Sequence, residues 1–299
     1  MKVLVTGTSG QLGFDVMEEL ARRGYTGVGA DRSESNADFE HVILDITDKA
    51  RVMEVVKEVN PDVIVHCAAW TNVDGAEAPE NLNVVRAVNV DGTRNLAEAA
   101  KEVGAKFVYI STDYVFDGQG ERPWQPDDKN YAPLNVYGQS KLDGELAVAE
   151  TLDKYFIVRI AWVFGRNGKN FIKTMIEVGK THPEVSVVAD QIGTPTYTVD
   201  LARLLVDMIE TDKYGYYHAT NEGGYISWAD FAEEIYKQAG MDVKVKHVST
   251  DEYEKIAGKA VAKRPFNSRL DKTKLVENGF TPLPEWQDAT KRFIDLLKN

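Results

Sequence analysis

The chain begins with a short β-branched strand that leads directly into a glycine-rich turn and then into a helical stretch. The strand is KVLVT (residues 2–6), and the turn contains Gly7, Gly10 and Gly13. Glycines in such a turn allow a tight bend, close approach of the backbone to a pyrophosphate and close packing of the helix on the sheet. The free N–H groups at the helix N-terminus favour the phosphates. This beginning predicts a dinucleotide-binding βαβ unit.

Strands and helices alternate through the first half of the chain. Apolar runs such as DVIVH (62–66) and KFVYIS (106–111) stand between amphipathic stretches, and YFIVRIAWVFG (155–165) is expected to form one further strand. Near-continuous apolar strands between helices are typical of a parallel sheet with both faces covered. The first half therefore predicts an α/β fold with a doubly wound, mostly parallel (Rossmann) sheet.

The pattern becomes less regular after Gly165, which predicts a smaller C-terminal substrate-binding domain. We expect residues 1–165 to form the dinucleotide-binding domain and residues 166–299 the substrate-binding domain. The helical stretch at 198–210 and the strand-like GYYHAT (215–220) could return to the first sheet. On that basis residues of about 196–221 join the first domain, and the second domain is discontinuous.

Composition excludes two classes of partner. The net charge of −12 argues against nucleic acid and against anionic membrane surfaces, because both attract basic proteins. No apolar run approaches the roughly 20 residues of a membrane span, and the start MKVLVTG lacks the longer apolar region of a signal peptide. The single cysteine, Cys67, fits a reducing compartment. These features predict a cytoplasmic protein.

The ends of the next strands carry residues that suit a dinucleotide. Asp31 ends the second strand, where an acid accepts hydrogen bonds from the ribose hydroxyls, whereas the adjacent Arg32 could pair with a 2′-phosphate. The choice between NADPH and NADH is therefore open. Near the adenine we expect Asp45 and Ile46, and beside the dinucleotide backbone the small residues Ala68 and Ala69.

Two residues with proton chemistry stand four positions apart in NVYGQSK (135–141). On a helix, Tyr137 and Lys141 share one face, and an ammonium one turn away would lower the high pKa of a phenol. Tyr137 could then give a proton to an oxygen that gains charge when hydride arrives. Thr112, at the end of the fifth strand, could hold a substrate carbonyl, although a Ser-Thr pair there can also cap a turn.

Together these motifs resemble the extended short-chain dehydrogenase/reductases, and more closely the dTDP-4-dehydrorhamnose reductase family. The resemblance rests on STDYVFDG (111–118), NVYGQSKLDGE (135–145), AWVFG (161–165), NFIKTM (170–175), DQIGTPT (190–196) and KRPFNSRLD (263–271). It implies reduction of the C4 ketone of dTDP-4-dehydro-L-rhamnose to dTDP-L-rhamnose with NADPH, or with NADH, for polysaccharide synthesis. It also implies a small-molecule nucleotide sugar as partner and a monomer or homodimer.

The resemblance implies roles for individual residues as well. Tyr137 would be the proton donor, Lys141 its partner and Thr112 the residue that tunes the site. Dinucleotide contacts are implied for Gly10, Gln11, Leu12, Asp31, Asp45, Ile46, Ala69, Trp70 and Thr71, and substrate contacts for Thr112, Asp113, Trp162, Asn170 and Arg264.

Some features depart from the family pattern or allow another function. Trp70 stands where relatives often have histidine, and Arg264 could be a surface arginine before a proline. Some bacterial relatives share magnesium at a dimer interface through acidic residues, and Asp15 matches one such position, although the rest of that site is not found in this sequence. An exposed acid on a first helical turn needs no metal, and we expect none. The alternatives are a non-catalytic regulatory subunit of the methionine adenosyltransferase type and another nucleotide-sugar epimerase or dehydratase. Against a dehydratase, Thr112 is followed by Asp113 and Tyr114, without a second carboxylate.

Overall fold

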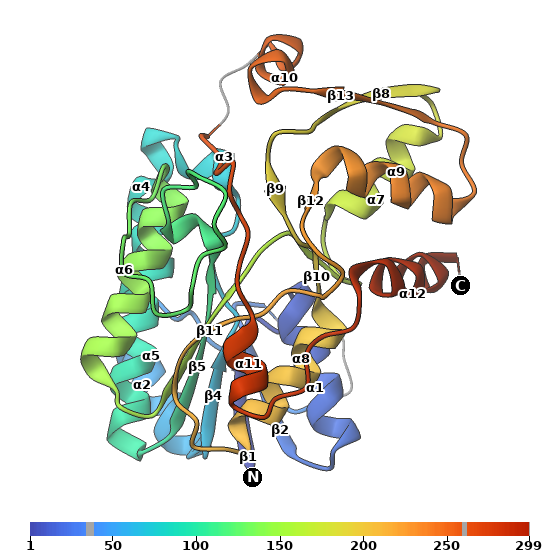
Figure 1. Cartoon of the computed structure of the whole chain (residues 1–299). Helices are drawn as coiled ribbons and strands as arrows, with labels where there is room; N and C mark the ends of the chain where they lie inside the picture. The colour runs from blue at the N-terminus through green and yellow to red at the C-terminus, as the bar shows by residue number, and fades with distance from the viewer. Residues whose placement is uncertain (34–38, 259–261, 299) are drawn as a thin grey trace.

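Seven parallel strands form the centre of the larger lobe (Figure 1). The computed structural model describes residues 1–33, 39–258 and 262–298. The strands of this sheet are β1 (Lys2–Thr6), β2 (Thr26–Asp31), β3 (His41–Ile43), β4 (Val63–His66), β5 (Lys106–Thr112), β6 (Tyr155–Ile160) and β11 (Gly215–His218). Every pairing between them is parallel.

The strand order is β11-β6-β5-β4-β1-β2-β3. The chain therefore builds the sheet outward from β1 in one direction and then restarts beside β1 with β4 in the other. Open α/β sheets bind ligands outside the carboxyl ends of the strands at such a switch point. This order confirms the doubly wound parallel sheet predicted from the alternating pattern.

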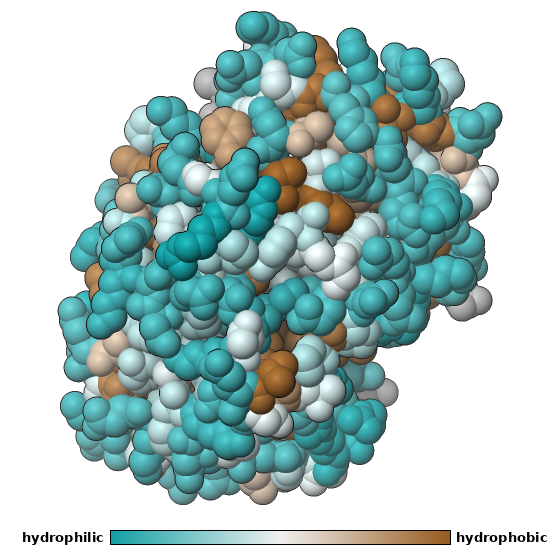
Figure 2. Space-filling view, in the orientation of Figure 1, coloured by the Kyte–Doolittle hydropathy of each residue, from teal (hydrophilic) through white to brown (hydrophobic). Residues whose placement is uncertain are grey.

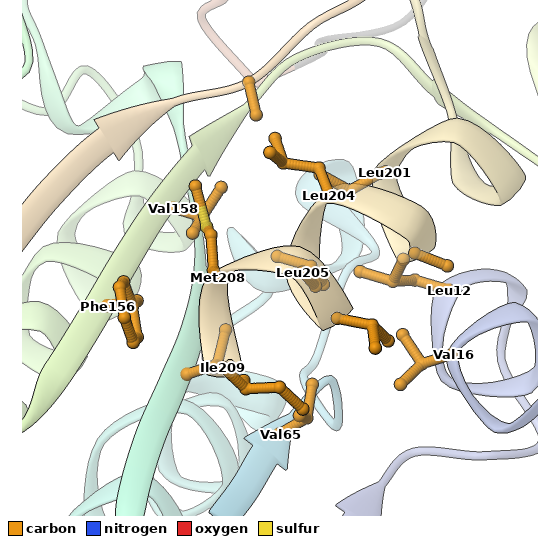
Figure 3. Packing of buried hydrophobic residues seen from close by; sticks show 14 of the residues in the cluster. Leu12, Val16, Val65, Phe156, Val158, Leu201, Leu204, Leu205, Met208 and Ile209 are labelled. Atoms are coloured by element: carbon orange, nitrogen blue, oxygen red, sulfur yellow. The ribbon is translucent and has the colours of Figure 1, made fainter. Parts of the chain in front are cut away.

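Helices cover both faces of the sheet. On one face α1 packs with α8 against apolar side chains of β1, β4 and β6, and Figure 3 shows Leu12 and Val16 meeting Leu201 and Leu205 there. The opposite face is covered by α2, α5 and α6. The helices are α1 (Gln11–Arg22), α2 (Lys49–Val59), α5 (Thr93–Val103), α6 (Val136–Thr151) and α8 (Thr198–Ile209).

Short elements connect these layers on the ligand side of the sheet. They are α3 (Val73–Ala76), the 3₁₀ turn η1 (Pro79–Asn81), α4 (Leu82–Arg86), the π-helical segment η2 (Ala87–Gly92) and the 3₁₀ turn η3 (Asp113–Val115). A further short helix, α11 (Thr273–Glu277), lies against β11.

The smaller lobe has an aromatic core. Trp286, Phe231 and Phe293 are buried between α9, α12 and the neighbouring chain. Its elements are α7 (Phe171–Gly179), β8 (Glu184–Val188), β9 (Ile192–Gly193), β12 (Ile226–Ser227), α9 (Trp228–Ala239), β13 (Lys244–Val248), α10 (Thr250–Ala257) and α12 (Trp286–Lys298). β8 pairs with β13 and β9 with β12, so the lobe holds only small two-stranded sheets among its described residues.

The expected single strand over residues 155–165 is wrong. The strand β6 ends at Ile160, and Trp162 has a left-handed backbone with φ of 52°. The chain then continues as β7 (Val163–Phe164), which leaves the large sheet and pairs with β10 (Thr196–Tyr197). Apolar periodicity could not reveal this turn, because no glycine, proline or asparagine interrupts the run before Gly165.

The chain returns to the large sheet late in the sequence. α8 packs on α1, and β11 pairs with β6 at the edge of the sheet. The assignment of domains at residues 165 and 166, with residues of about 196–221 in the first, stays a prediction.

The surface in Figure 2 is mostly hydrophilic. Hydrophilic residues cover most of the face shown in Figure 2, and apolar residues reach it in small separate groups. Among the described residues, no helix is both long enough and apolar enough to cross a membrane.

A buried ion pair joins α6 to strand β6 of the large sheet. Arg159 on β6 donates to both oxygens of Glu145 at 2.8 and 2.7 Å, and both side chains are 0% exposed. Arg159 also donates to the carbonyl of Pro126 at 3.0 Å. The pair fixes one side of the helix that carries Tyr137 and Lys141.

Substituting Arg159 tests how strongly the fold depends on this pair. Arg159→Met should lower the free energy of unfolding by about 3–5 kcal/mol, because it leaves the Glu145 carboxylate buried and uncompensated. Lys57→Met, which removes a pair exposed by 53% and 57%, should change it by less than about 1 kcal/mol. Urea unfolding measures both, and equal small losses would show that Arg159 is not essential to the core.

Candidate active site

A cavity of about 610 Å³ lies at the carboxyl edge of the large sheet. Its walls come from the segments after β1, β2, β3, β4, β5 and β6, together with α6 and the first turn of α9. The structure brings together in this cavity Gly7, Gly10, Gln11, Leu12, Gly13, Asp31, Arg32, Asp45, Ile46, Ala68, Ala69, Trp70, Thr71, Thr112, Asp113, Tyr137, Lys141 and Trp162. Of the residues expected to contact the cofactor or the substrate, Asn170 and Arg264 do not line it.

The glycine turn has no room for side chains. A Cβ on Gly7, which has φ of 74°, would lie 2.6 Å from the backbone nitrogen of Ala68, and one on Gly13 would lie 2.3 Å from the carbonyl oxygen of Gly7. Gly10 is the N-cap of α1 and offers no side chain to the first N–H groups of that helix. A phosphate can therefore reach these N–H groups, and the turn fits a dinucleotide.

The side chain of Asp31 is hydrogen-bonded to the backbone, whereas that of Arg32 is exposed to solvent. The Asp31 carboxylate accepts from the backbone N–H of Ser9 at 3.0 Å and from that of Arg32 at 2.8 Å, so it braces the glycine turn. The side chain of Arg32 is exposed at the rim of the cavity. An exposed guanidinium at the ribose end can pair with a 2′-phosphate.

Asn89 connects the dinucleotide side of the cavity to α6. Within the π-helical segment, its side chain accepts from Trp70 N–H at 2.8 Å and donates to the Trp70 carbonyl at 3.1 Å. It also donates to Ser140 Oγ at 2.9 Å, and Ser140 in turn donates to the Tyr137 carbonyl at 2.7 Å. Sequence reasoning missed Asn89, and its only local signal was a polar residue inside an apolar helical stretch.

The helix α6 begins where an asparagine caps it, two residues before the tyrosine. Asn135 Oδ1 accepts from Gly138 N–H at 2.7 Å, and its amide donates to the carbonyl of Lys263 at 2.7 Å. This cap sets the start of the helix, so Tyr137 and Lys141 lie one turn apart on the cavity face. Lys141 is 4% exposed, and its Nζ lies 4.0 Å from the ring centre of Tyr109.

Burial dominates the titration of this pair. It raises the pKa of Tyr137 well above 10, and Asp113 adds to this, while a hydrogen bond with Thr112 opposes it. Burial also lowers the pKa of Lys141 to about 7 from its usual 10.5. The expectation of a lowered Tyr137 pKa is therefore wrong, because desolvation of the buried phenol dominates its titration. Tyr137 keeps its proton at neutral pH, which is the state a proton donor needs.

Beside Tyr137 stands a buried acid. Asp113 is 1% exposed and accepts from Thr112 Oγ1 at 3.1 Å and from Ser268 Oγ at 2.5 Å. Burial raises its pKa to about 6. Ser111 Oγ lines the same wall, is buried and has no hydrogen-bond partner among the described residues. This wall can therefore offer hydrogen bonds to a polar ligand.

A second cavity, of about 340 Å³, lies in the smaller lobe. Arg264 lines it and is paired with Asp74 at 3.0 Å and with the carbonyl of Ala262 at 3.1 Å. Trp228 lines both cavities, so they adjoin at this residue.

Asn170 and Asp15 take positions that the sequence did not reveal. Asn170 lines neither cavity; it caps α7 and donates to Gln11 Oε1 at 3.0 Å, so it touches the glycine turn indirectly. Asp15 is buried rather than exposed, accepts from Thr198 Oγ1 at 2.5 Å, and has its pKa raised to about 6 by burial. Its position on α1, packed against α8, explains this burial.

Comparison with known proteins decides the family. The chain matches the RmlD substrate binding domain family over residues 1–299. It is 41% identical to the dTDP-4-dehydrorhamnose reductase of Streptomyces griseus over 292 residues, which are 96% of this chain and 90% of that protein. The chain belongs to the RmlD family, that of the dTDP-4-dehydrorhamnose reductases.

Solved structures of RmlD-family proteins extend this similarity to three dimensions. A dTDP-4-dehydrorhamnose reductase from Clostridium acetobutylicum is 42% identical with a TM-score of 0.91, over 100% of both chains. One from Bacillus anthracis, in complex with NADP, is 43% identical with a TM-score of 0.89, over 100% of this chain and 99% of that one. The RmlD-family match includes both lobes.

The low pKa of Lys141 has a consequence for stability in this RmlD-family member. Between pH 7 and about 10 the unfolded chain binds the Lys141 proton more tightly than the folded chain. The free energy of unfolding contributed by this group should therefore rise with pH, by up to about 1.4 kcal/mol per unit. Compared with Lys141→Met, the wild type should gain stability from pH 7 to 10 in urea unfolding. Parallel curves for the two proteins would contradict the buried, weakly basic lysine.

Proposed function

We propose that this protein reduces the C4 ketone of dTDP-4-dehydro-L-rhamnose, with NADPH or NADH, to give dTDP-L-rhamnose. One observation carries the proposal: Tyr137, Lys141 and Thr112 line the same cavity as the complete set of residues expected to hold a dinucleotide. Family membership and the names of the relatives support the same substrate.

The residues present fit a nicotinamide dinucleotide. The side-chain-free turn and the uncapped start of α1 would hold its pyrophosphate, and Asp31 and Arg32 would lie at the adenosine ribose. The exposed Arg32 supports NADPH, in agreement with the NADP bound by the relative from Bacillus anthracis. When bound, the reduced nicotinamide supplies the hydride that adds to C4.

Tyr137 gives the proton that completes the reduction. Its buried phenol stays protonated at neutral pH, and the C4 oxygen gains negative charge as the hydride arrives. Proton transfer then yields the alcohol and a tyrosinate, which protonated Lys141 stabilises from one helical turn away. Thr112, hydrogen-bonded to Tyr137, would hold the ketone oxygen within reach of the phenol.

The sugar nucleotide would span the two cavities. Its hexose would lie against Thr112, Asp113 and Trp162, and its nucleotide would extend into the cavity that Arg264 lines. A guanidinium suits a diphosphate. Asn170 would act on the substrate only through Gln11 and the glycine turn.

Other functions have weaker support. Elimination by a dehydratase needs a base beside Thr112, but burial raises the pKa of the Tyr114 phenol well above 10 and there is no second carboxylate at that position. A purely regulatory subunit would not require the proton donor, its lysine and the dinucleotide turn to converge on one cavity. The cysteine content supports a cytoplasmic location, and the protein would act there as a monomer or homodimer.

Tyr137→Phe tests the proton donor. The ring is kept and only the hydroxyl is lost, so the fold should survive while turnover falls by roughly 10²–10⁴-fold. Tyr214→Phe is the matched control, since its hydroxyl donates to Asp212 and the residue lines neither cavity. NADPH oxidation in the presence of the keto sugar measures both. Wild-type turnover in folded Tyr137→Phe would overturn the assignment.

A further inference from the structure

The turn at Trp162 is unusual for a large side chain. Among the described residues, only Asn60 and Trp162 have a left-handed backbone without being glycine, and Asn60 merely ends α2. Bulky residues avoid this conformation, and where it occurs the surroundings must hold it. At Trp162 this left-handed conformation turns the chain out of the large sheet. Trp162 also lines the cavity that contains Tyr137.

Two contacts hold Trp162 in this position. Its indole stacks on that of Trp228, with ring centres 3.8 Å apart and planes inclined by 17°. Gly193 also leaves space for the indole, because a Cβ there would lie 3.0 Å from Trp162 Cε2. The backbone is fixed as well, since the Trp162 carbonyl accepts from Thr196 N–H at 3.2 Å.

The smaller lobe places Trp228 for this stack. Trp228 is the first residue of α9, after Ser227, which caps the helix in a reciprocal arrangement with Asp230. The short strand that precedes it pairs Ser227 with Ile192 and Ile226 with Gly193. Gly193 thus lies in the two-stranded sheet, and Trp228 follows the other strand of that sheet directly.

Trp228 also lies where the two cavities adjoin. It is half-buried and lines both of them, whereas Trp162 lines only the large one. A sugar nucleotide that spans the cavities must pass the edge of this indole. Flat aromatic faces fit the C–H surface of a hexose, so the indole pair would limit rotation of the sugar about its link to the diphosphate.

We infer that Trp228 is a positioning residue that determines the configuration of the product at C4. Rotation of the hexose decides which face of the C4 carbonyl receives the hydride, and the two faces give the two C4 epimers. Trp228 acts by holding Trp162 in its left-handed conformation and by forming part of the wall where the cavities adjoin. This inference rests on the proposed reduction of a C4 ketone.

The test compares product configuration in Trp228→Leu, Trp228→Phe and Gly193→Ala with the wild type. Each is supplied with NADPH and dTDP-4-dehydro-L-rhamnose, and the C4 configuration of the product is read from NMR coupling constants. Trp228→Leu should raise the KM for the sugar nucleotide roughly 3- to 10-fold, leave the KM for NADPH unchanged, and release some of the C4 epimer. Trp228→Phe, which keeps an aromatic face, should restore a single configuration.

Gly193→Ala provides an independent variant, because its added Cβ crowds the Trp162 indole and the Cβ of Ser268 rather than Trp228, and it should release the epimer too. Trp286→Phe is the matched control: it lies in the aromatic core of the same lobe, is 5% exposed and lines neither cavity. Trp286→Phe is expected to lower the stability of the protein but to give a product with a single C4 configuration. A single configuration with unchanged KM in both Trp228→Leu and Gly193→Ala would overturn the inference. A wild type that does not reduce the sugar would instead overturn the proposed function.

Discussion

Parallel pairing forces all seven strands of the large sheet to end on the same edge, and the segments beyond those ends build the candidate site. The glycine turn comes after β1, Asp31 ends β2, the small residues Ala68 and Ala69 come after β4, and Thr112 ends β5. Because β4 restarts the sheet beside β1, the segments after these two strands diverge and leave space between them. The cavity is therefore a result of strand order more than of any single side chain.

Within that cavity, desolvation controls the acid–base chemistry. The same burial raises the pKa of Tyr137, raises that of Asp113 and lowers that of Lys141, so the uncharged form of each group is favoured. A proton donor suits such a place because it begins neutral. Lys141 is then most useful when a tyrosinate forms, since the interaction between opposite charges is strong in a poorly solvated site. The packed core around these groups offsets the energetic cost of burying them.

Much of this arrangement could be predicted from local patterns. The glycine turn, the strand ends and the Tyr–Lys spacing each depend on a few neighbouring residues, and all of them converge on the cavity. The turn at Trp162 could not be predicted, because its cause lies in the remote residues Trp228, Gly193 and Thr196.

The direction of the Tyr137 pKa shift was also beyond reach of the sequence, since spacing reveals the nearby lysine but not the degree of burial. The contacts of Asn89 and Asn170 could not be predicted from local sequence patterns either. Each acts through hydrogen bonds to residues 19 or more positions away, which no local pattern records.

The most direct test of the account is the stoichiometry of the reaction. A reductase consumes one reduced cofactor per sugar, whereas an epimerase or dehydratase of similar fold regenerates its dinucleotide within each cycle. The protein should oxidise one NADPH for each dTDP-4-dehydro-L-rhamnose converted, measured by absorbance and by product analysis, and conversion should stop once external cofactor is removed. Conversion that continues on tightly bound dinucleotide alone would contradict the account.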